Sequence, residues 1–254
     1  MLFLSSIVLV LFSCGYSLAQ HEHHNHMQHN HEEHRVNVAV YYESLCPDSR
    51  KFFTQQLYPS LQGNLSHYVN LTLVPYGKTT SELNLNEHTF TCHHGPNECR
   101  GNKIQACALR LIDAGQNTEG LGFNKIATGF INCLMDKADR EKGYFPTMDC
   151  AQINHVANLN TIDNCVNHTD ASNYLSKFGE LTDKLQKPLQ SVPTIVFNNV
   201  YNKEDSDLAQ INFVRALCKH IPGDKPECIK SGAGILQMSF VVVAVSIILS
   251  KFFS

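Results

Sequence analysis

The 254-residue sequence lacks a strong charge of either sign. Its formal net charge is -3 at pH 7, and no basic patch stands out, so the electrostatic signature of nucleic-acid binding is missing. Apolar residues make up 43% of the chain, which is enough for one domain with a sizeable core. The composition predicts a folded domain and no nucleic-acid partner.

The first residues lack the positive charge with which a signal peptide usually begins. Residues 1–12 nevertheless form an apolar run, and Ser17-Leu18-Ala19 is a small-x-small pattern. We therefore predict a signal peptide at residues 1–19, cleaved after Ala19. The alternative, a transmembrane anchor, is disfavoured because the apolar run is short. Three glycosylation sequons agree with the secretory pathway, at Asn64, Asn70 and Asn167.

Cleavage leaves an odd number of cysteines, because the chain has ten and Cys14 is removed. In an oxidising compartment an odd number implies one free thiol among disulfides, and we predict that Cys46 is the free one. Cys133, on a helix face, is the alternative. The pairing of the others stays open; they are Cys92, Cys99, Cys107, Cys133, Cys150, Cys165, Cys218 and Cys228.

Cys46 lies where a strand gives way to a helix. Apolar residues alternate over 36–42, which predicts a buried strand, and helical spacing follows until Pro59. Pro47 occupies the first helical position, and the free amides and dipole of a helix start favour the thiolate form of a cysteine. This arrangement is typical of thioredoxin-like redox sites.

The second cysteine of such a site is missing, because Ser49 stands three residues after Cys46. Cys46 can attack a disulfide, but Ser49 cannot resolve the mixed disulfide that results. The Ser49 hydroxyl can donate a hydrogen bond to the thiolate and stabilise it, whereas the nearby carboxylate of Asp48 opposes a second negative charge.

The remaining pattern predicts a βαβ unit followed by helices. Residues 69–74 form a second strand ended by Pro75, parallel to the first, and residues 81–90 are loop-like. Amphipathic helices are expected within residues 120–140 and, as the closing helix, over 205–218. A short helical stretch is expected between Cys150 and Cys165.

Cysteine and histidine are concentrated in residues 92–107. This composition allows either a zinc site or a disulfide-pinned loop, and in a secreted chain we favour the loop. Asn102 is predicted to cap the helix that follows. The pattern is Cys92-x-His94-Gly95-x-x-Glu98-Cys99-x-x-Asn102-x-x-x-x-Cys107.

This pattern resembles the signature of the gamma-interferon-inducible lysosomal thiol reductase (GILT) family, in which only His93 departs from the usual Gln. Residues 41–46 and 73–77 resemble further family segments. The resemblance covers residues 36–230 and implies an α/β, thioredoxin-like fold with a disulfide-rich helical insertion at about 92–190. It also implies a cis peptide bond before Pro193, facing Cys46, where the backbone of Val192 could pair with an extended peptide.

Two segments lie outside the resemblance. Residues 231–254 form an apolar tail, which predicts membrane attachment by a GPI signal or a membrane helix. Residues 20–35 form a His-rich leader that we expect to be disordered. The leader can bind zinc or copper weakly, respond to pH or act as a spacer; its histidines are His21, His23, His24, His26, His29, His31 and His34.

Three functions remain open from the sequence. The first is a monothiol oxidoreductase that acts on protein disulfides through Cys46, with Ser49 and Pro193 in the site. It would need no cofactor beyond an external thiol. The second is a secreted or membrane-tethered protein-binding module, and the third is metal binding by the leader. The expected location is the secretory pathway, with an extracellular, cell-surface or endolysosomal destination.

Overall fold

The computed structural model describes residues 35–85, 87–112, 118, 120–223 and 225–228. The predicted signal peptide, nearly all of the His-rich leader and the apolar tail lie outside the described residues. Within the described part of the chain, no helix is both long and apolar enough to cross a membrane.

A three-stranded sheet forms the centre of the fold. Strand β1 (Val36–Tyr42) lies between β2 (Val69–Pro75), with which it is parallel, and β5 (Thr194–Phe197), with which it is antiparallel. Alternate β1 side chains are buried in the core. The predicted βαβ unit is therefore correct, and β5 begins directly after Pro193.

The helical segment after Cys46 ends one residue beyond Pro59, as predicted. It consists of α1 (Pro47–Phe52), a π-helical turn η2 (Phe53–Leu57) and α2 (Tyr58–Ser60). Pro59 is the second residue of α2 and Ser60 is its last, so the helix stops where the proline predicted. A 3-10 helix, η3 (Asn64–Tyr68), then leads into β2.

Two predictions around residues 80–111 are wrong. Residues 81–90 are not a loop, because β3 (Thr80–Asn84) pairs antiparallel with β4 (Glu87–Thr91). Every residue of β3 is exposed, so no alternating pattern marks it as a strand. Asn102 is not a helix cap, because α3 (Pro96–Leu111) begins after Gly95 and buries Asn102 inside the helix.

Helices between β4 and β5 form a second core. They pack apolar residues of α3, α4 (Lys125–Lys137), α5 (Thr147–Ile153) and α6 (Leu159–Val166) against one another. The helical stretch expected between Cys150 and Cys165 is thus two helices. The long helix α7 (Thr169–Leu185) completes the insertion.

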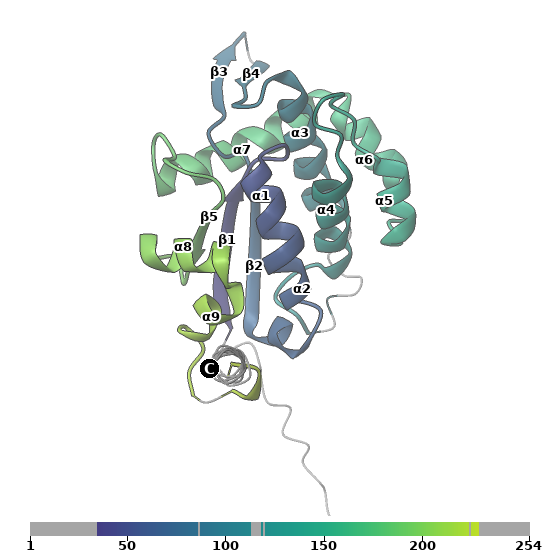
Figure 1. Cartoon of the computed structure of the whole chain (residues 1–254). Coiled ribbons are helices and arrows are strands. Elements are labelled where there is room, and N and C mark those ends of the chain that lie inside the picture. Colours follow the sequence, from purple (N-terminus) through teal and green to yellow (C-terminus); the bar gives the residue numbers. More distant parts are fainter. Residues whose placement is uncertain (1–34, 86, 113–117, 119, 224, 229–254) are drawn as a thin grey trace, which may run out of the picture. The chain divides into compact units, whose positions relative to one another are not determined.

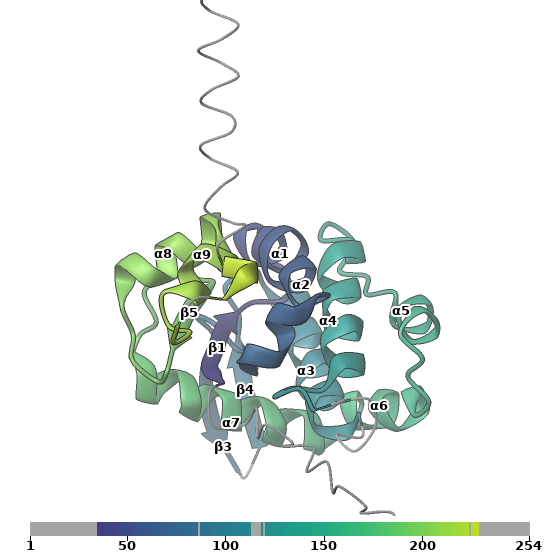
Figure 2. The same ribbon diagram turned by 90° about the horizontal axis from the view of Figure 1, so that it is seen from below.

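Helices cover both faces of the sheet. Figures 1 and 2 show α1 and α2 on one side of β1 and β2, with α7 on the other side and α4 to α6 beside them. The predicted closing helix is divided into α8 (Lys203–Ile211) and α9 (Phe213–Cys218). The break is at Asn212, whose side chain accepts a hydrogen bond from the Arg215 amide and caps α9.

Four disulfides join the cysteines of the described residues, and Cys46 is the free cysteine among them. Cys133 is paired, so the alternative assignment of the free thiol is wrong. Two bridges lie within the helical core. The pairs are Cys92–Cys99, Cys107–Cys165, Cys133–Cys150 and Cys218–Cys228.

Removing the bridge between α3 and α6 should destabilise the fold more than removing the bridge at the start of α3. The Cys107–Cys165 bridge spans 58 residues and the Cys92–Cys99 bridge spans 7. Loop-closure entropy gives losses of about 4 and about 2 kcal/mol on replacing each pair by alanine. Urea unfolding measures both, and equal losses would contradict this expectation.

Candidate functional site

The Cys46 thiol lies at the start of α1. The residue is the N-cap of the helix, with Pro47 next, and it is only 5% exposed. Its sulfur lies 3.9 Å from the carbonyl oxygen of Val192. The peptide bond between Val192 and Pro193 is cis, and Pro193 is buried at the start of β5. Cys46 and Pro193, two of the three residues predicted for the site, therefore lie on facing loops.

Ser49 is also in the first turn of α1, and its hydroxyl is hydrogen-bonded elsewhere. Its side chain is fully buried, and its hydroxyl oxygen lies 3.5 Å from the amide of Glu43, from which it accepts. The described hydrogen bonds contain none between Ser49 and Cys46. The expected stabilisation of the thiolate by Ser49 is thus not formed, because the hydroxyl faces the end of β1.

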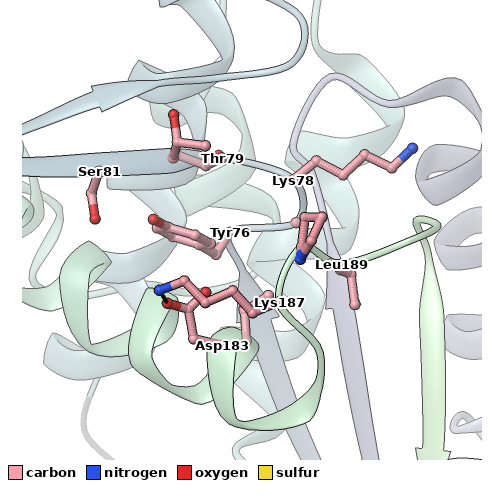
Figure 3. Close-up of a pocket in the computed structure, with 11 residues that line it drawn as sticks. Tyr76, Lys78, Thr79, Ser81, Asp183, Lys187 and Leu189 are labelled. Carbon is pink, nitrogen blue, oxygen red and sulfur yellow. Dashed lines mark hydrogen bonds and ion pairs between the residues drawn. The ribbon is translucent and has the colours of Figure 1, made fainter.

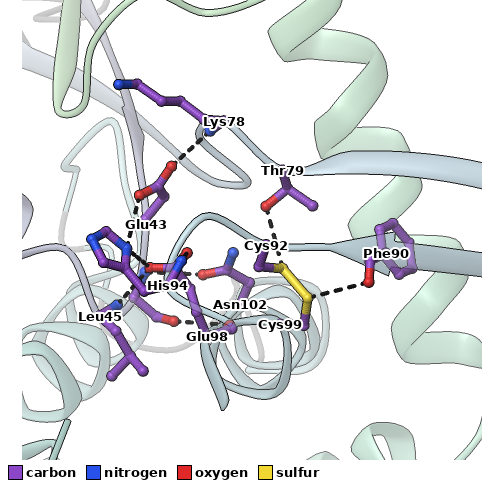
Figure 4. Close-up of a disulfide and its surroundings, with 11 residues drawn as sticks. Glu43, Leu45, Lys78, Thr79, Phe90, Cys92, His94, Glu98, Cys99 and Asn102 are labelled. Atoms are coloured by element: carbon purple, nitrogen blue, oxygen red, sulfur yellow. Dashed lines mark hydrogen bonds and ion pairs between the residues drawn. A yellow bond between two sulfur atoms is a disulfide. The ribbon is translucent and has the colours of Figure 1, made fainter. Parts of the chain in front are cut away.

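The loop between β1 and Cys46 is attached to α3 by side-chain hydrogen bonds (Figure 4). The Ser44 amide donates to Asn102 Oδ1 at 2.9 Å, and its hydroxyl donates to the Glu98 carbonyl at 3.1 Å. The Leu45 amide donates to Glu98 Oε2 at 3.3 Å. Both partners belong to the signature pattern, so these residues position the loop that carries Cys46.

Two acidic and two histidine side chains meet beside this loop. Glu43 and Glu98 are fully buried. Glu43 Oε2 lies 3.2 Å from Nδ1 of both His93 and His94, and Glu98 Oε2 lies 2.7 Å from His94 Nδ1. Burial and then the charge of Glu43 raise the pKa of Glu98, while hydrogen bonds from His94 lower it. The site concentrates buried negative charge next to Cys46.

The choice between a zinc site and a disulfide loop is settled for the cysteines of the signature. Cys92 and Cys99 form a disulfide that closes the turn before α3, so their sulfurs are not metal ligands. The histidines of the same segment point instead toward the carboxylates, as His94 does in Figure 4.

A cavity of about 360 Å³ lies beside the site without including it (Figure 3). Its walls are residues 76–81, which follow β2, and residues from the end of α7 and the loop after it. Cys46, Ser49 and Pro193 are not among the lining residues. Asp183 and Lys187 form an ion pair at its wall.

The sequons all lie at the surface. Asn64, Asn70 and Asn167 are exposed, and Asn70 is on the outward face of β2, as its predicted glycosylation requires. Sequence reasoning missed the role of Glu43. The signal that could have indicated it is an acidic residue directly after a strand predicted to be buried.

The chain is similar in sequence to members of one protein family. The family model "Gamma interferon inducible lysosomal thiol reductase (GILT)" matches residues 37–169. "GILT-like protein 1" of Drosophila melanogaster is 43% identical over 219 residues, covering 85% of this chain and 86% of the relative. "Gamma-interferon-inducible lysosomal thiol reductase" of Mus musculus is 30% identical over 198 residues, covering 77% and 72%.

A solved structure shows the fold. BdbD from Bacillus subtilis, in its oxidised form, superimposes with a TM-score of 0.50 at 18% identity, covering 74% of this chain and 88% of that one. The predicted α/β, thioredoxin-like fold with a disulfide-rich helical insertion is confirmed.

A methyl group at Gly101 should disturb the Cys46 loop. A Cβ there would lie 2.2 Å from Phe145 Cζ and 2.4 Å from Ser44 Oγ, whereas one at Gly63 would have nothing within 4 Å. We expect Gly101→Ala to lose about 1–3 kcal/mol of stability and to change the alkylation rate of Cys46. The Gly63→Ala control should change stability by less than about 1 kcal/mol.

Denaturant unfolding and timed alkylation with mass spectrometry measure both effects. A Gly101→Ala protein as stable as the Gly63→Ala control, with the same alkylation rate at Cys46, would show that α3 does not position the loop.

Proposed function

Since the chain belongs to the gamma interferon inducible lysosomal thiol reductase family, we propose that it is a thiol-disulfide oxidoreductase with Cys46 as its single nucleophile. The observation that carries this proposal is the position of Cys46. It is the free cysteine of the described residues, it begins a helix, and it faces the loop of the cis Pro193.

The reaction begins when the Cys46 thiolate attacks one sulfur of a substrate disulfide. The substrate S–S bond breaks, a bond from Cys46 to the substrate sulfur forms, and the first substrate thiolate leaves and takes a proton. Val192 and Pro193 bind the polypeptide next to the disulfide, since backbone groups before this proline can pair with an extended chain.

An external thiol completes the cycle because Ser49 cannot. It attacks the Cys46 sulfur, which releases the second substrate thiol and leaves the external thiol bound to Cys46. A second external thiol then attacks the sulfur of the first external thiol in that disulfide. This forms a disulfide between the two external thiols and frees Cys46. The balance is one substrate disulfide reduced and two external thiols oxidised, with no prosthetic cofactor.

The protein acts in the secretory or endolysosomal pathway. The four disulfides support this location, because such bonds persist in oxidising compartments and are rare in the cytosol. The matching relative from mouse is named as lysosomal. The partners of the present protein are proteins that contain disulfides.

A protein-binding module on the same scaffold is the second candidate. Two observations favour it: Ser49 stands where a resolving cysteine would be, and Cys46 is only 5% exposed. A binding module would use the surface around Val192 and would not turn over disulfides.

Restoring a dithiol distinguishes the two candidates. Ser49→Cys makes resolution intramolecular, so we expect disulfide reduction to accelerate about tenfold or more. Cys46→Ser should reduce the rate to that of the external thiol alone. Reduction of a model protein disulfide by glutathione measures the rates, and mass spectrometry detects the mixed disulfide on Cys46.

Ser60→Cys is the matched control, since it adds one thiol on the same helical segment, at the end of α2. It should leave the rate of the unaltered protein unchanged. A folded Ser49→Cys protein with no gain, together with no trapped mixed disulfide on Cys46 in the unaltered chain, would reject the oxidoreductase and leave the binding module.

A further inference from the structure

We propose that Glu43, His93 and His94, here called the Glu43 cluster, form a binding site for a divalent transition metal, for which Zn²⁺ is the fitting ion. Glu43 directly follows β1, and the two histidines lie in the turn before α3. Their ligand atoms lie within 4.8 Å of one another. The proposal does not depend on the redox function of Cys46.

The spacing of the donor atoms suits zinc. Glu43 Oε2 lies 3.2 Å from Nδ1 of His93 and 3.2 Å from Nδ1 of His94. In a tetrahedral site with metal–ligand bonds of about 2.0–2.1 Å, ligand atoms are about 3.3 Å apart. Two imidazoles and one carboxylate are also a set that zinc accepts, with a fourth position left for water.

Glu43 is already oriented for this role (Figure 4). Its Oε1 accepts a hydrogen bond from the Lys78 amide at 2.8 Å, which leaves Oε2 for the histidines. Gly77 permits this approach, because a Cβ there would lie 2.2 Å from Glu43 Cγ. A backbone donor that fixes a liganding carboxylate is a common feature of protein metal sites.

The buried charge favours a cation. Glu43 and Glu98 are both fully buried, and in the described part of the chain their ion-pair partners are His93 and His94. Buried carboxylates are costly unless they are paired or bind metal. A divalent ion would replace the contact of His94 with Glu98, which keeps hydrogen bonds from the Leu45 and His94 amides.

An ion can reach the cluster from solvent. The side chain of His93 is 48% exposed and that of His94 is 25% exposed. His93 is the more exposed of the two histidines. Replacing it removes a ligand near the surface without opening the core.

The test uses the full mature chain with the seven leader histidines changed to serine, because residues 20–35 would otherwise bind metal themselves. In this background protein we expect one Zn²⁺ per chain in competition with a chromophoric chelator. His93→Gln should weaken binding by about tenfold or more. His88→Gln, a histidine outside the cluster on β4, is the matched control and should bind as before.

Two further measurements make the outcome unambiguous. Zn²⁺ should raise the melting temperature of the background protein but not that of the His93→Gln protein. Co²⁺ should give d–d bands without a thiolate charge-transfer band, and Cys46→Ser should leave that spectrum unchanged. No stoichiometric zinc, equal affinity after His93→Gln, or a charge-transfer band that Cys46→Ser abolishes would each overturn the proposal.

Discussion

The hydrogen bonds from α3 to the loop before Cys46 are the constraint on which the site depends. The amides of Ser44 and Leu45 are buried, and they are satisfied by the side chains of Asn102 and Glu98. A buried donor without a partner costs about 1–3 kcal/mol, so the loop has one favourable position. That position fixes the end of β1 relative to the start of α1, and with it the thiol.

The helical insertion therefore holds in place the loop that carries Cys46. Its own core and its disulfides hold α3 in place, and the Cys92–Cys99 bridge shapes the turn that leads into that helix. The signature pattern, in which the polar residues look like candidates for catalysis, consists largely of groups that orient a backbone segment.

The same arrangement gathers ionisable side chains beside the loop that carries Cys46. Glu98 contacts the loop from the interior of the fold, and Glu43 is buried beside it. The histidines that pair with these two carboxylates lie at the surface of the same cluster. The proposed nucleophile and the proposed zinc site thus both depend on how α3 packs against the loop. Ser49 Oγ accepts a hydrogen bond from the Glu43 amide, and in the proposed reaction an external thiol resolves the mixed disulfide.

Local pattern by itself determined the strand at 36–42 and the placement of Cys46 at a helix start, because alternation and a proline at the first helical position act on neighbouring residues. The odd number of cysteines indicated a free thiol but did not indicate how the other cysteines pair. Tertiary structure decided that residues 81–90 form a ribbon, since every residue of β3 is exposed and no alternation of burial marks that strand. It also decided the role of Asn102, whose partner Ser44 lies 58 residues away, beyond the reach of any local pattern.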